Sequence, residues 1–334
     1  MSAQSAIMMH DSGEVLYEKA ADEPRLIAST TKLMTALVVL EHCALDEEVE
    51  IPAACCGLEG SSVYLSPGQR CTVRELLLGL LLASANDAAA ALACHVAGDE
   101  AGFALLMNEQ ARALGMDRSA FVNPHGLDAE GHYATARDLA RLMLRCMEEP
   151  GFRELCTQQS AQVGDQTVYN HNKLLSRCPG CVGGKTGYTR AAGRCLVSCV
   201  EREGELLVCV TLSDPDDWDD HTRLYDWAYA HYARRLLADE SLCFQIPVLS
   251  GEDKLVTVRP QRSCTRFLPR EAEVELTAEL PRFCFAPVTG GGEAGRLLVH
   301  WDDLILDEIP LLFDTDVEET EMGVLGVIIE EMLS

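Results

Sequence analysis

Residues 28–42 read ASTTKLMTALVVLEH. The segment begins with hydroxyl side chains, and apolar residues then recur at the spacing of one helix face, at Leu33, Met34, Leu37 and Leu40. This pattern predicts a buried helix over 28–42 that is capped by hydroxyls. Ser29 and Lys32 are three positions apart, so the helix would place both side chains on one face, about one turn apart.

Two more short motifs follow in order. Ser84-Ala85-Asn86 comes directly after a second predicted helix, Thr72–Leu82, which opens with a Thr-x-x-Glu capping box. The triplet should therefore lie on a loop between helices. Lys185-Thr186-Gly187 falls in a predicted strand centred on Gly184–Thr189. Together the three motifs supply a serine nucleophile, two amines and a cationic strand.

These residue types suit acyl transfer through a serine ester. Serine is a weak nucleophile unless a base lies within hydrogen-bond reach. Lys32 can be that base only when its amine is neutral, and burial together with a nearby cation such as Lys185 lowers the pKa of an amine. Ser84 can relay a proton between the lysines and the leaving amine. We therefore predict Ser29, Lys32 and Ser84 as the catalytic residues.

The neighbouring positions are predicted to bind substrate. The Asn86 amide can donate and accept hydrogen bonds and so orient an amide of the substrate. Lys185 and the hydroxyl of Thr186 can hold a terminal carboxylate, and Gly187 lacks the side chain that would obstruct it. Two backbone N–H groups are the expected oxyanion donors, those of Ser29 and Tyr188.

Each motif has a plainer explanation when it is taken alone. A serine in a first helical turn usually only caps the helix, Ser84-Ala85-Asn86 fits a turn, and Lys185-Thr186-Gly187 could simply end a strand. His125 and His171 are more typical of loop-structuring residues than of bases. The order of the three motifs, on a helix, a loop and a strand, favours the catalytic interpretation.

The chain as a whole predicts an α+β fold followed by a small all-β region. A hairpin at 6–18, Ala-rich helices up to Thr135–Met147, three late strands and a final helix over Trp218–Leu237 would form a catalytic domain, residues 1–237. Short alternating runs broken by proline and glycine then predict a β-rich domain over 238–313. An acidic linker and a short apolar tail, Met322–Leu333, occupy 314–334. The tail is too short to span a bilayer, so a surface-lying helix or the stump of an anchor are the alternatives for C-terminal membrane association.

Composition excludes some partners. A formal net charge of −26 argues against nucleic acids and anionic membrane surfaces, which bind basic stripes.

Many of the 15 cysteines lie in apolar runs, where they act as small hydrophobic residues. Cys178 and Cys181 have the spacing of a redox pair or a metal site, and a zinc site, a loop disulfide and free thiols are all open. The aspartates over 216–220 are expected to form a solvated helix start.

With these motifs the chain resembles the low-molecular-mass penicillin-binding proteins, which are serine D-alanyl-D-alanine carboxypeptidases of the peptidase S11 family. The likeness spans 6–237 and includes Ser66-Pro67-Gly68, Asn123-Pro124-His125-Gly126-Leu127 and Thr135-Ala136-Arg137-Asp138. It implies a β-lactamase/transpeptidase-like fold with a second, β-rich domain. It also implies removal of the terminal D-Ala from peptidoglycan stem pentapeptides through an acyl-enzyme on Ser29, without a metal or organic cofactor.

The resemblance further implies that β-lactams acylate the same serine and that the protein acts outside the cytoplasm, on the outer face of the cytoplasmic membrane. The sequence itself shows no signal peptide. It departs from some members at Asn170-His171-Asn172-Lys173, where they carry arginine, and at Tyr188, where others carry histidine.

Three rival functions stay open. A β-lactamase would need a further base, for which Glu148-Glu149-Pro150 is the local candidate. A DD-endopeptidase usually lacks the C-terminal β-rich domain. A non-catalytic cell-wall-binding scaffold would not need the intact serine and lysines.

Overall fold

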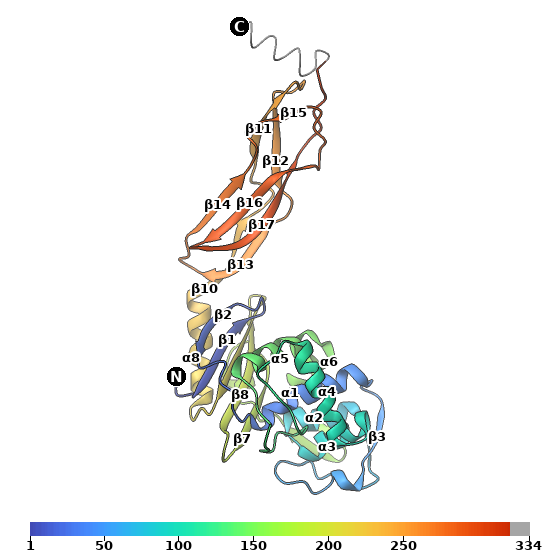
Figure 1. The fold of residues 1–334 in the computed structure, drawn as a ribbon. Coiled ribbons are helices and arrows are strands. Elements are labelled where there is room, and N and C mark those ends of the chain that lie inside the picture. The colour runs from blue at the N-terminus through green and yellow to red at the C-terminus, as the bar shows by residue number, and fades with distance from the viewer. Residues whose placement is uncertain (321–334) are drawn as a thin grey trace. The chain divides into compact units, whose positions relative to one another are not determined.

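A five-stranded antiparallel sheet organises the first part of the chain. In the computed structural model, which describes residues 1–320, its strands lie in the order β2-β1-β9-β8-β7 (Figure 1). These strands are β1 Ser5–His10, β2 Val15–Lys19, β7 Cys181–Thr189, β8 Gly193–Arg202 and β9 Glu205–Leu212. The predicted N-terminal hairpin and the three predicted late strands therefore belong to one sheet, in which β1 pairs with β9.

Helices cover both faces of this sheet. On one face α5 (Ala136–Glu148) packs against β1, β8 and β9, and the other early helices gather on the same side (Figure 1). On the opposite face lies α8 (Asp217–His231), whose buried His221 bonds Ser198 of β8 at 2.7 Å and Thr211 of β9 at 3.0 Å. The sheet is thus buried on both sides, which holds β7 and β8 rigidly.

The helices predicted up to residue 147 are present with small shifts at their ends: besides α5 they are α1 Lys32–His42, α2 Val73–Leu82, α3 Asn86–Ala97 and α4 Glu100–Ala113. Two short helices that were not predicted, α6 Pro150–Cys156 and α7 Leu174–Arg177, lie between α5 and β7. The capping box at the start of α2 is confirmed, because Thr72 accepts from the Glu75 N–H at 3.2 Å and Glu75 accepts from the Thr72 N–H at 2.8 Å. Four short strands complete the unit: β3 Glu48–Glu50, β4 Arg70–Thr72, β5 Ser160–Val163 and β6 Gln166–Tyr169.

The prediction of a hydroxyl-capped helix over 28–42 is wrong at its start. Residues Ala28–Thr31 form a 3₁₀ turn, and no side chain caps α1. The hydroxyls of Thr30 and Thr31 donate instead to the carbonyls of Ile27 and Ala28, at 2.6 and 2.8 Å. Threonine hydroxyls that bond nearby carbonyls favour a local turn over a helix, so Ser29 lies in the turn that precedes α1.

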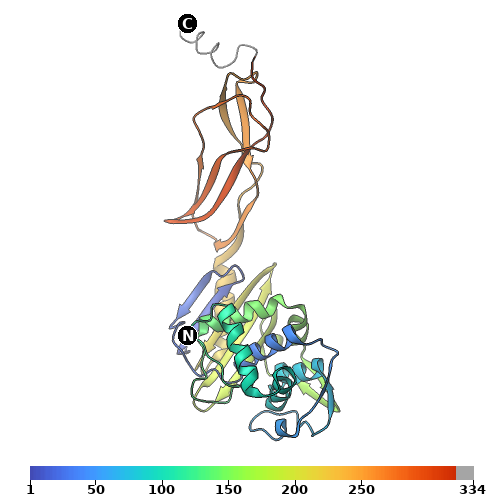
Figure 2. The same cartoon turned by 45° about the vertical axis from the view of Figure 1, so that its right-hand side comes forward.

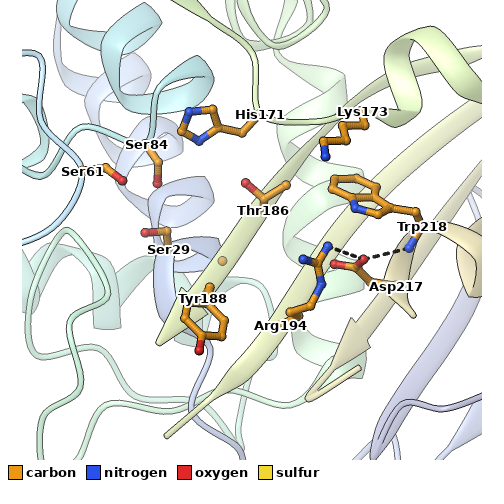
Figure 3. Close-up of a pocket in the computed structure, with 11 residues that line it drawn as sticks. Ser29, Ser61, Ser84, His171, Lys173, Thr186, Tyr188, Arg194, Asp217 and Trp218 are labelled. Carbon is orange, nitrogen blue, oxygen red and sulfur yellow. Dashed lines mark hydrogen bonds and ion pairs between the residues drawn. The ribbon is translucent and has the colours of Figure 1, made fainter. Parts of the chain in front are cut away.

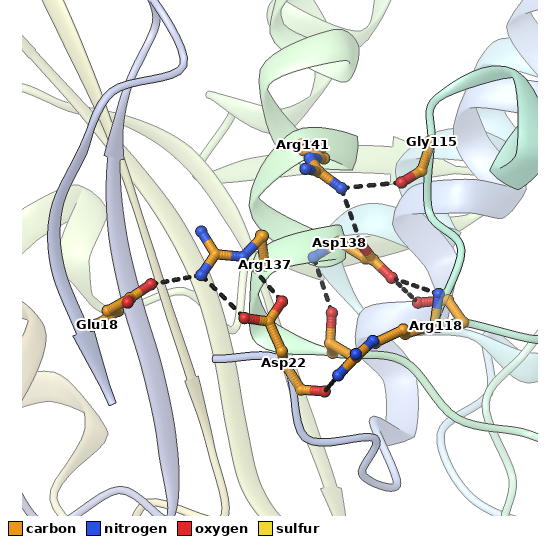
Figure 4. A network of polar contacts seen from close by, with 9 residues as sticks. Glu18, Asp22, Gly115, Arg118, Arg137, Asp138 and Arg141 are labelled. Carbon is orange, nitrogen blue, oxygen red and sulfur yellow. Dashed lines mark hydrogen bonds and ion pairs between the residues drawn. The ribbon is translucent and has the colours of Figure 1, made fainter. Parts of the chain in front are cut away.

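The segment Thr135-Ala136-Arg137-Asp138 ties α5 to its surroundings (Figure 4). Thr135 caps the helix through the Asp138 N–H, and the Asp138 carboxylate accepts from the N–H of Arg118 and the hydroxyl of Ser119. The Arg137 guanidinium bonds Asp22 at 2.8 Å and also Glu18 of β2. These residues lie outside the pocket described below, and their contacts join the N-terminal hairpin to α5.

A second unit begins at Tyr229, and the elements that the structure describes in it beyond the end of α8, up to residue 320, are strands, drawn in orange to red in Figure 2. β10 (Tyr232–Ala238) pairs with β13 (Cys264–Pro269), and a six-stranded sheet has the order β14-β16-β17-β12-β11-β15. The strands of that sheet are β11 Phe244–Leu249, β12 Leu255–Pro260, β14 Val274–Glu279, β15 Cys284–Phe285, β16 Glu293–Trp301 and β17 Leu304–Phe313.

Two expectations for this part of the chain need correction. The predicted helix over 218–237 ends at His231, because residues 232–238 pair with β13, and the first unit accordingly ends at Ala228 rather than at residue 237. Residues 314–320 are not a free linker: Val317 is buried and bridges to Val288, and the Thr320 N–H donates to the Ser250 carbonyl at 2.8 Å. The apolar tail predicted over 322–333 lies outside the described residues.

Within residues 1–320 we find no individual helix with both the length and the apolar character needed to cross a membrane; α3 and α4 meet these criteria only as a pair, with an 83° bend between them.

Candidate active site

The three sequence motifs meet at one pocket of about 330 Å³ in the first unit (Figure 3). Figure 3 shows the hydroxyls of Ser29, Ser61 and Ser84 at one end of it, and Lys173, Arg194 and Trp218 at the other. The residues that line it are Ser29, Ser61, Ser84, His171, Lys173, Thr186, Gly187, Tyr188, Arg194, Asp217 and Trp218. The three remaining predicted residues, Lys32, Asn86 and Lys185, are buried and bond directly to this lining or to one another.

The amine of Lys32 is the centre of the buried contacts. Its Nζ lies 2.9 Å from Ser29 Oγ, 2.7 Å from Asn86 Oδ1 and 2.6 Å from the carbonyl oxygen of His125. A neutral amine has two N–H donors and one lone pair. Asn86 and His125 offer only acceptor oxygens, so they take the two donors. The lone pair is then left facing the Ser29 hydroxyl.

The environment favours this neutral form. Burial lowers the pKa of Lys32 well below its usual value, the nearby Lys185 lowers it further, and Asp87 opposes the shift in part. Lys185 is also buried, which lowers its pKa to about 7. Its Nζ bonds Ser84 Oγ at 3.1 Å and the Thr186 carbonyl at 2.8 Å. Because the pKa of each amine is lowered, small changes in its surroundings can make it gain or lose a proton.

Backbone strain is present at two positions of the pocket. Ala28, directly before Ser29, has φ +47°, and Ser84 has φ +62°. Side chains other than glycine rarely adopt this left-handed region, and each such residue costs roughly 1–3 kcal/mol, which the surrounding contacts must offset. These two backbone conformations set the directions in which the side chains of Ser29 and Ser84 point.

The loop over 122–132 supplies those contacts to the Ser29 turn. His132 accepts the Val122 N–H at Nδ1, so its Nε2–H donates to the Thr31 hydroxyl at 2.7 Å. Burial, with His125 nearby, lowers the pKa of His132 to about 4, which keeps this ring neutral. A Cβ on Gly126 would lie 2.0 Å from the Ala28 carbonyl oxygen, so only glycine permits this approach.

Strand β7 reaches the same turn from the other side. A Cβ on Gly187 would lie 3.0 Å from both the Ser29 nitrogen and the Ile27 carbonyl oxygen. From the sequence we predicted that Gly187 leaves room for a ligand carboxylate. The structure adds a second reason, because the strand must pack against the backbone of Ser29.

The far end of the pocket holds residues that the sequence argument missed. Arg194 of β8 stands in register with Tyr188 of β7, and its guanidinium bonds Asp217 at 2.6 Å and lies 5.7 Å from the centre of the Trp218 ring. Among the described residues, the buried Nε of Arg194 has no hydrogen-bond partner. The register of the β7–β8 hairpin was a usable signal, since counting back from its turn places Arg194 opposite Tyr188.

The aspartates over 216–220 begin α8 as expected, but of the four only Asp216 and Asp219 are exposed to solvent. Asp217 and Asp220 are buried; Asp217 holds Arg194, and Asp220 accepts the backbone N–H of Ser2. Burial raises the pKa of Asp217, which its hydrogen bond to Arg194 partly offsets. Tertiary partners, which the sequence pattern could not supply, cover these carboxylates.

Comparison with known proteins identifies the family. A model of the peptidase S11 family, described as D-alanyl-D-alanine carboxypeptidase, matches residues 1–216. The chain belongs to this family. D-alanyl-D-alanine carboxypeptidase DacF of Bacillus subtilis is 30% identical over 335 aligned positions, which cover 95% of this chain and 86% of that protein. DacB2 of Mycobacterium tuberculosis, a D-alanyl-D-alanine carboxypeptidase, is 37% identical over 232 positions, covering 66% and 79%.

A solved structure extends the likeness to nearly the whole chain. Penicillin binding protein 5 from Haemophilus influenzae superposes with a TM-score of 0.77 at 25% sequence identity, and the match covers 96% of this chain and 98% of that one. The predicted fold, a penicillin-binding-protein domain followed by a sheet-rich region, is therefore confirmed.

Two other sequence signals lie outside the pocket of this S11 enzyme. Glu149, from the segment named above as the candidate base of a β-lactamase, bonds Arg145 at 2.6 Å, and neither Glu148 nor Glu149 lines the pocket. Cys178 and Cys181 are both free thiols, with no disulfide bond between them. Within residues 1–320 neither belongs to a group of three potential metal ligands.

Proposed function

We propose that this chain removes the terminal D-Ala from peptidoglycan stem peptides through an ester on Ser29. Membership of the S11 family supports the D-Ala-D-Ala substrate and the acylation of the same serine by β-lactams. The observation that carries the proposal is the set of contacts of Lys32: two acceptors occupy its N–H groups, and its third contact is the Ser29 hydroxyl, 2.9 Å away. A serine with such a base is an activated nucleophile.

Acylation then uses the two lysines in turn. Lys32 takes the Ser29 proton as the oxygen attacks the carbonyl carbon of the penultimate D-Ala, and the bond to the terminal D-Ala breaks. The departing amine must gain a proton, and the chain from Lys185 to Ser84, 3.1 Å long, is the route that we assign to it. Asn86 accepts from Lys32 at Oδ1 and donates one N–H of its amide to the Glu59 carbonyl at 2.6 Å, and we assign its second N–H to the substrate's amide.

Charge that develops on the attacked carbonyl needs donors beside Ser29. The close approach of Gly187 to the Ser29 nitrogen supports the N–H groups of Ser29 and Tyr188 as that pair. Removal of one such donor typically costs about 10²–10³ in rate.

The free carboxylate of the terminal D-Ala is assigned to Thr186 and Arg194. Arg194 lines the same pocket as Thr186 with a side chain that is 41% exposed, and Asp217 holds its guanidinium in place. Guanidinium groups recognise carboxylates through charge-assisted hydrogen bonds. This contact favours substrates that end in a free carboxylate.

After D-Ala leaves, water completes the cycle. Lys32 first passes on the proton that it took from Ser29, which restores the charge of Lys185 and leaves Lys32 neutral. Lys32 then takes a proton from the attacking water and returns it to the Ser29 oxygen as the ester bond breaks and the shortened peptide leaves. The placement of Glu148 and Glu149 away from the pocket argues against fast β-lactam hydrolysis. We expect slow single turnover of nitrocefin, whereas fast turnover would favour a β-lactamase.

Family membership supports action on the cell wall, and we extend it to an extracytoplasmic location. The two units of the chain argue against the DD-endopeptidase alternative, which usually lacks a β-rich second region.

One experiment tests the nucleophile directly. Wild type should release D-Ala from diacetyl-Lys-D-Ala-D-Ala, and Ser29→Ala should release none. Intact-mass spectrometry after benzylpenicillin should show one adduct on wild type, mapped to Ser29. Ser61→Ala is the matched control, because Ser61 lines the same pocket and should keep the adduct. Equal D-Ala release by wild type and Ser29→Ala would reject the assignment.

A further inference from the structure

Helices α1 and α3 pack together and are linked at both ends. Near their N-terminal ends Lys32 and Asn86 bond each other in the active site, at 2.7 Å. At the far end lie Cys43, which follows α1 directly, and His95 in the last turn of α3. Glu47, from the loop that leads to β3, joins them there. The α1 helix of 11 residues rises about 16 Å. The far end is therefore remote from Ser29.

The three side chains at this end converge. The Cys43 sulfur, one Glu47 carboxylate oxygen and one His95 ring nitrogen all lie within 4.8 Å of one another. The His95 Nε2 and Glu47 Oε1 atoms are 2.8 Å apart. A tetrahedral zinc ion binds sulfur at about 2.3 Å and nitrogen or oxygen at about 2.0–2.2 Å, so its ligand atoms lie about 3–4 Å apart. Side-chain rotation alone can therefore bring this set to zinc-binding distances.

The donor chemistry selects the metal. A thiolate, an imidazole and a carboxylate are all ligands of Zn²⁺, whereas Ca²⁺ and Mg²⁺ prefer oxygen ligands alone. Three protein ligands leave one tetrahedral position for water. Cys43 is half-buried, Glu47 is exposed, and His95 is half-buried, so an ion can reach them from solvent.

The electrostatic potential at this end of α1 and α3 favours a cation. The C-terminal ends of α1 and α3 meet here, and each helix end carries partial negative charge from its unpaired carbonyls. Within the described part of the chain, the one ion pair of Glu47 is with His95, so no lysine or arginine neutralises it. Asp46 precedes Glu47 in the sequence and adds negative charge, whereas Glu48 is paired with Arg70 at 3.2 Å. The two helix ends and the Glu47 carboxylate would be stabilised by a bound divalent ion.

We propose that Cys43, Glu47 and His95 bind one Zn²⁺ ion that clamps the C-terminal ends of α1 and α3. On binding, the Cys43 thiol releases its proton to solvent, and the Glu47 carboxylate and His95 Nε2 exchange their mutual hydrogen bond for bonds to the metal. The ion takes no part in acyl transfer. It holds together the two helices whose opposite ends carry Lys32 and Asn86.

The test uses the full chain with its thiols reduced. Co²⁺ replaces Zn²⁺ as a spectroscopic probe, because a cobalt–thiolate bond gives a charge-transfer band in the near ultraviolet and tetrahedral cobalt gives strong visible bands. Wild type should show both, saturating at one equivalent, and Zn²⁺ should displace the cobalt. Zn²⁺ should also raise the Tm of wild type, because a ligand that binds only the folded state stabilises it.

Variants assign the ligands. Cys43→Ser should abolish the charge-transfer band. Glu47→Gln and His95→Gln should each weaken Zn²⁺ binding by at least about tenfold to a hundredfold, as measured by calorimetry. These two positions are accessible to solvent, so both variants should fold even if Cys43→Ser does not. The matched control is Cys55→Ser, since Cys55 contacts Cys94, the neighbour of His95, through sulfurs 3.5 Å apart.

The proposal is overturned if wild type gives no charge-transfer band, or if the band survives in Cys43→Ser and disappears in Cys55→Ser. It is also overturned if Glu47→Gln and His95→Gln both bind Zn²⁺ as tightly as wild type. None of these readouts depends on activity, so they stand apart from the test of Ser29.

Discussion

The floor and the rim of the active-site pocket are built in opposite ways. The floor is formed by Lys32, Lys185 and Asn86, and the rim by Lys173, Tyr188, Arg194 and Trp218. Lys32 is 0% and Lys185 1% exposed, whereas Tyr188 is 67% exposed. Amines in the floor have lowered pKa values and fixed partners, while the charges of the rim face water. In the mechanism that we propose, this difference separates proton transfer, which needs a neutral amine, from substrate selection, which needs a permanent charge.

The floor is also held more tightly than the rim. Strained backbone at Ala28 and Ser84, the His125 carbonyl and the His132–Thr31 hydrogen bond all constrain it. Preorganised groups of this kind act without reorganisation when charge develops. Substitutions in the floor should therefore cost more activity than substitutions in the rim.

The largest effect is expected for Lys32→Ala. Removal of the base should slow acylation by benzylpenicillin by about 10²–10⁴-fold, measured by stopped-flow or quenched mass spectrometry. The fold should persist, since alanine is tolerated in a helix, and circular dichroism checks this. The matched control is Lys173→Ala, which removes an exposed amine from the rim and should cost about fivefold or less. Comparable losses in both variants would break the distinction between floor and rim.

A smaller effect is expected for Arg194→Ala. Loss of a charge-assisted hydrogen bond to the substrate carboxylate, worth about 1.5–3 kcal/mol, should lower kcat/KM for diacetyl-Lys-D-Ala-D-Ala by about 10–100-fold. The same peptide with a C-terminal amide should be turned over equally by wild type and variant. Tyr188→Ala, a nearby exposed position, should change neither value by more than a few-fold. If the variant loses activity equally on acid and amide, Arg194 supports the structure of the pocket rather than the carboxylate.

The smallest effect concerns stability and pH. The pKa of Lys185 is about 7 in the folded chain and 10.5 for an ordinary lysine. Between these values the unfolded chain binds a proton that the folded chain does not. Lys185 therefore makes the free energy of unfolding rise with pH, by up to about 1.4 kcal/mol per pH unit, and below pH 7 it adds no slope.

Urea unfolding of wild type and Lys185→Met between pH 7 and 10 measures this slope. The difference in stability, wild type minus variant, should grow in favour of wild type as pH rises. Other titrating groups, including the buried cysteines, are common to both proteins and cancel. Lys173→Met, which removes an amine from the exposed rim, is the matched control. A flat difference for Lys185→Met would show that the floor amine keeps an ordinary pKa.

Local chemistry explains what could be predicted. The capping box of α2 needs only Thr72 and Glu75, and the hairpin strands need only alternation around a turn, so the sequence predicts both. The residue types of the three motifs and their order also indicated acyl transfer and one shared site. These signals depend on side-chain chemistry and on neighbours within a few residues.

Other features depend on contacts that no local pattern encodes. A backbone carbonyl has no sequence signature, so we did not predict that the His125 carbonyl accepts from Lys32. The left-handed backbone of Ala28 was not predicted either. Residues 232–238 read as helix, yet they pair with β13 as a strand. The Asp217–Arg194 pair joins α8 to β8, and only packing of α8 on the sheet brings it to the pocket. Sequence by itself thus predicted the groups that we propose to react. Tertiary structure decided which of them are charged and where they point, because burial and distant partners set both.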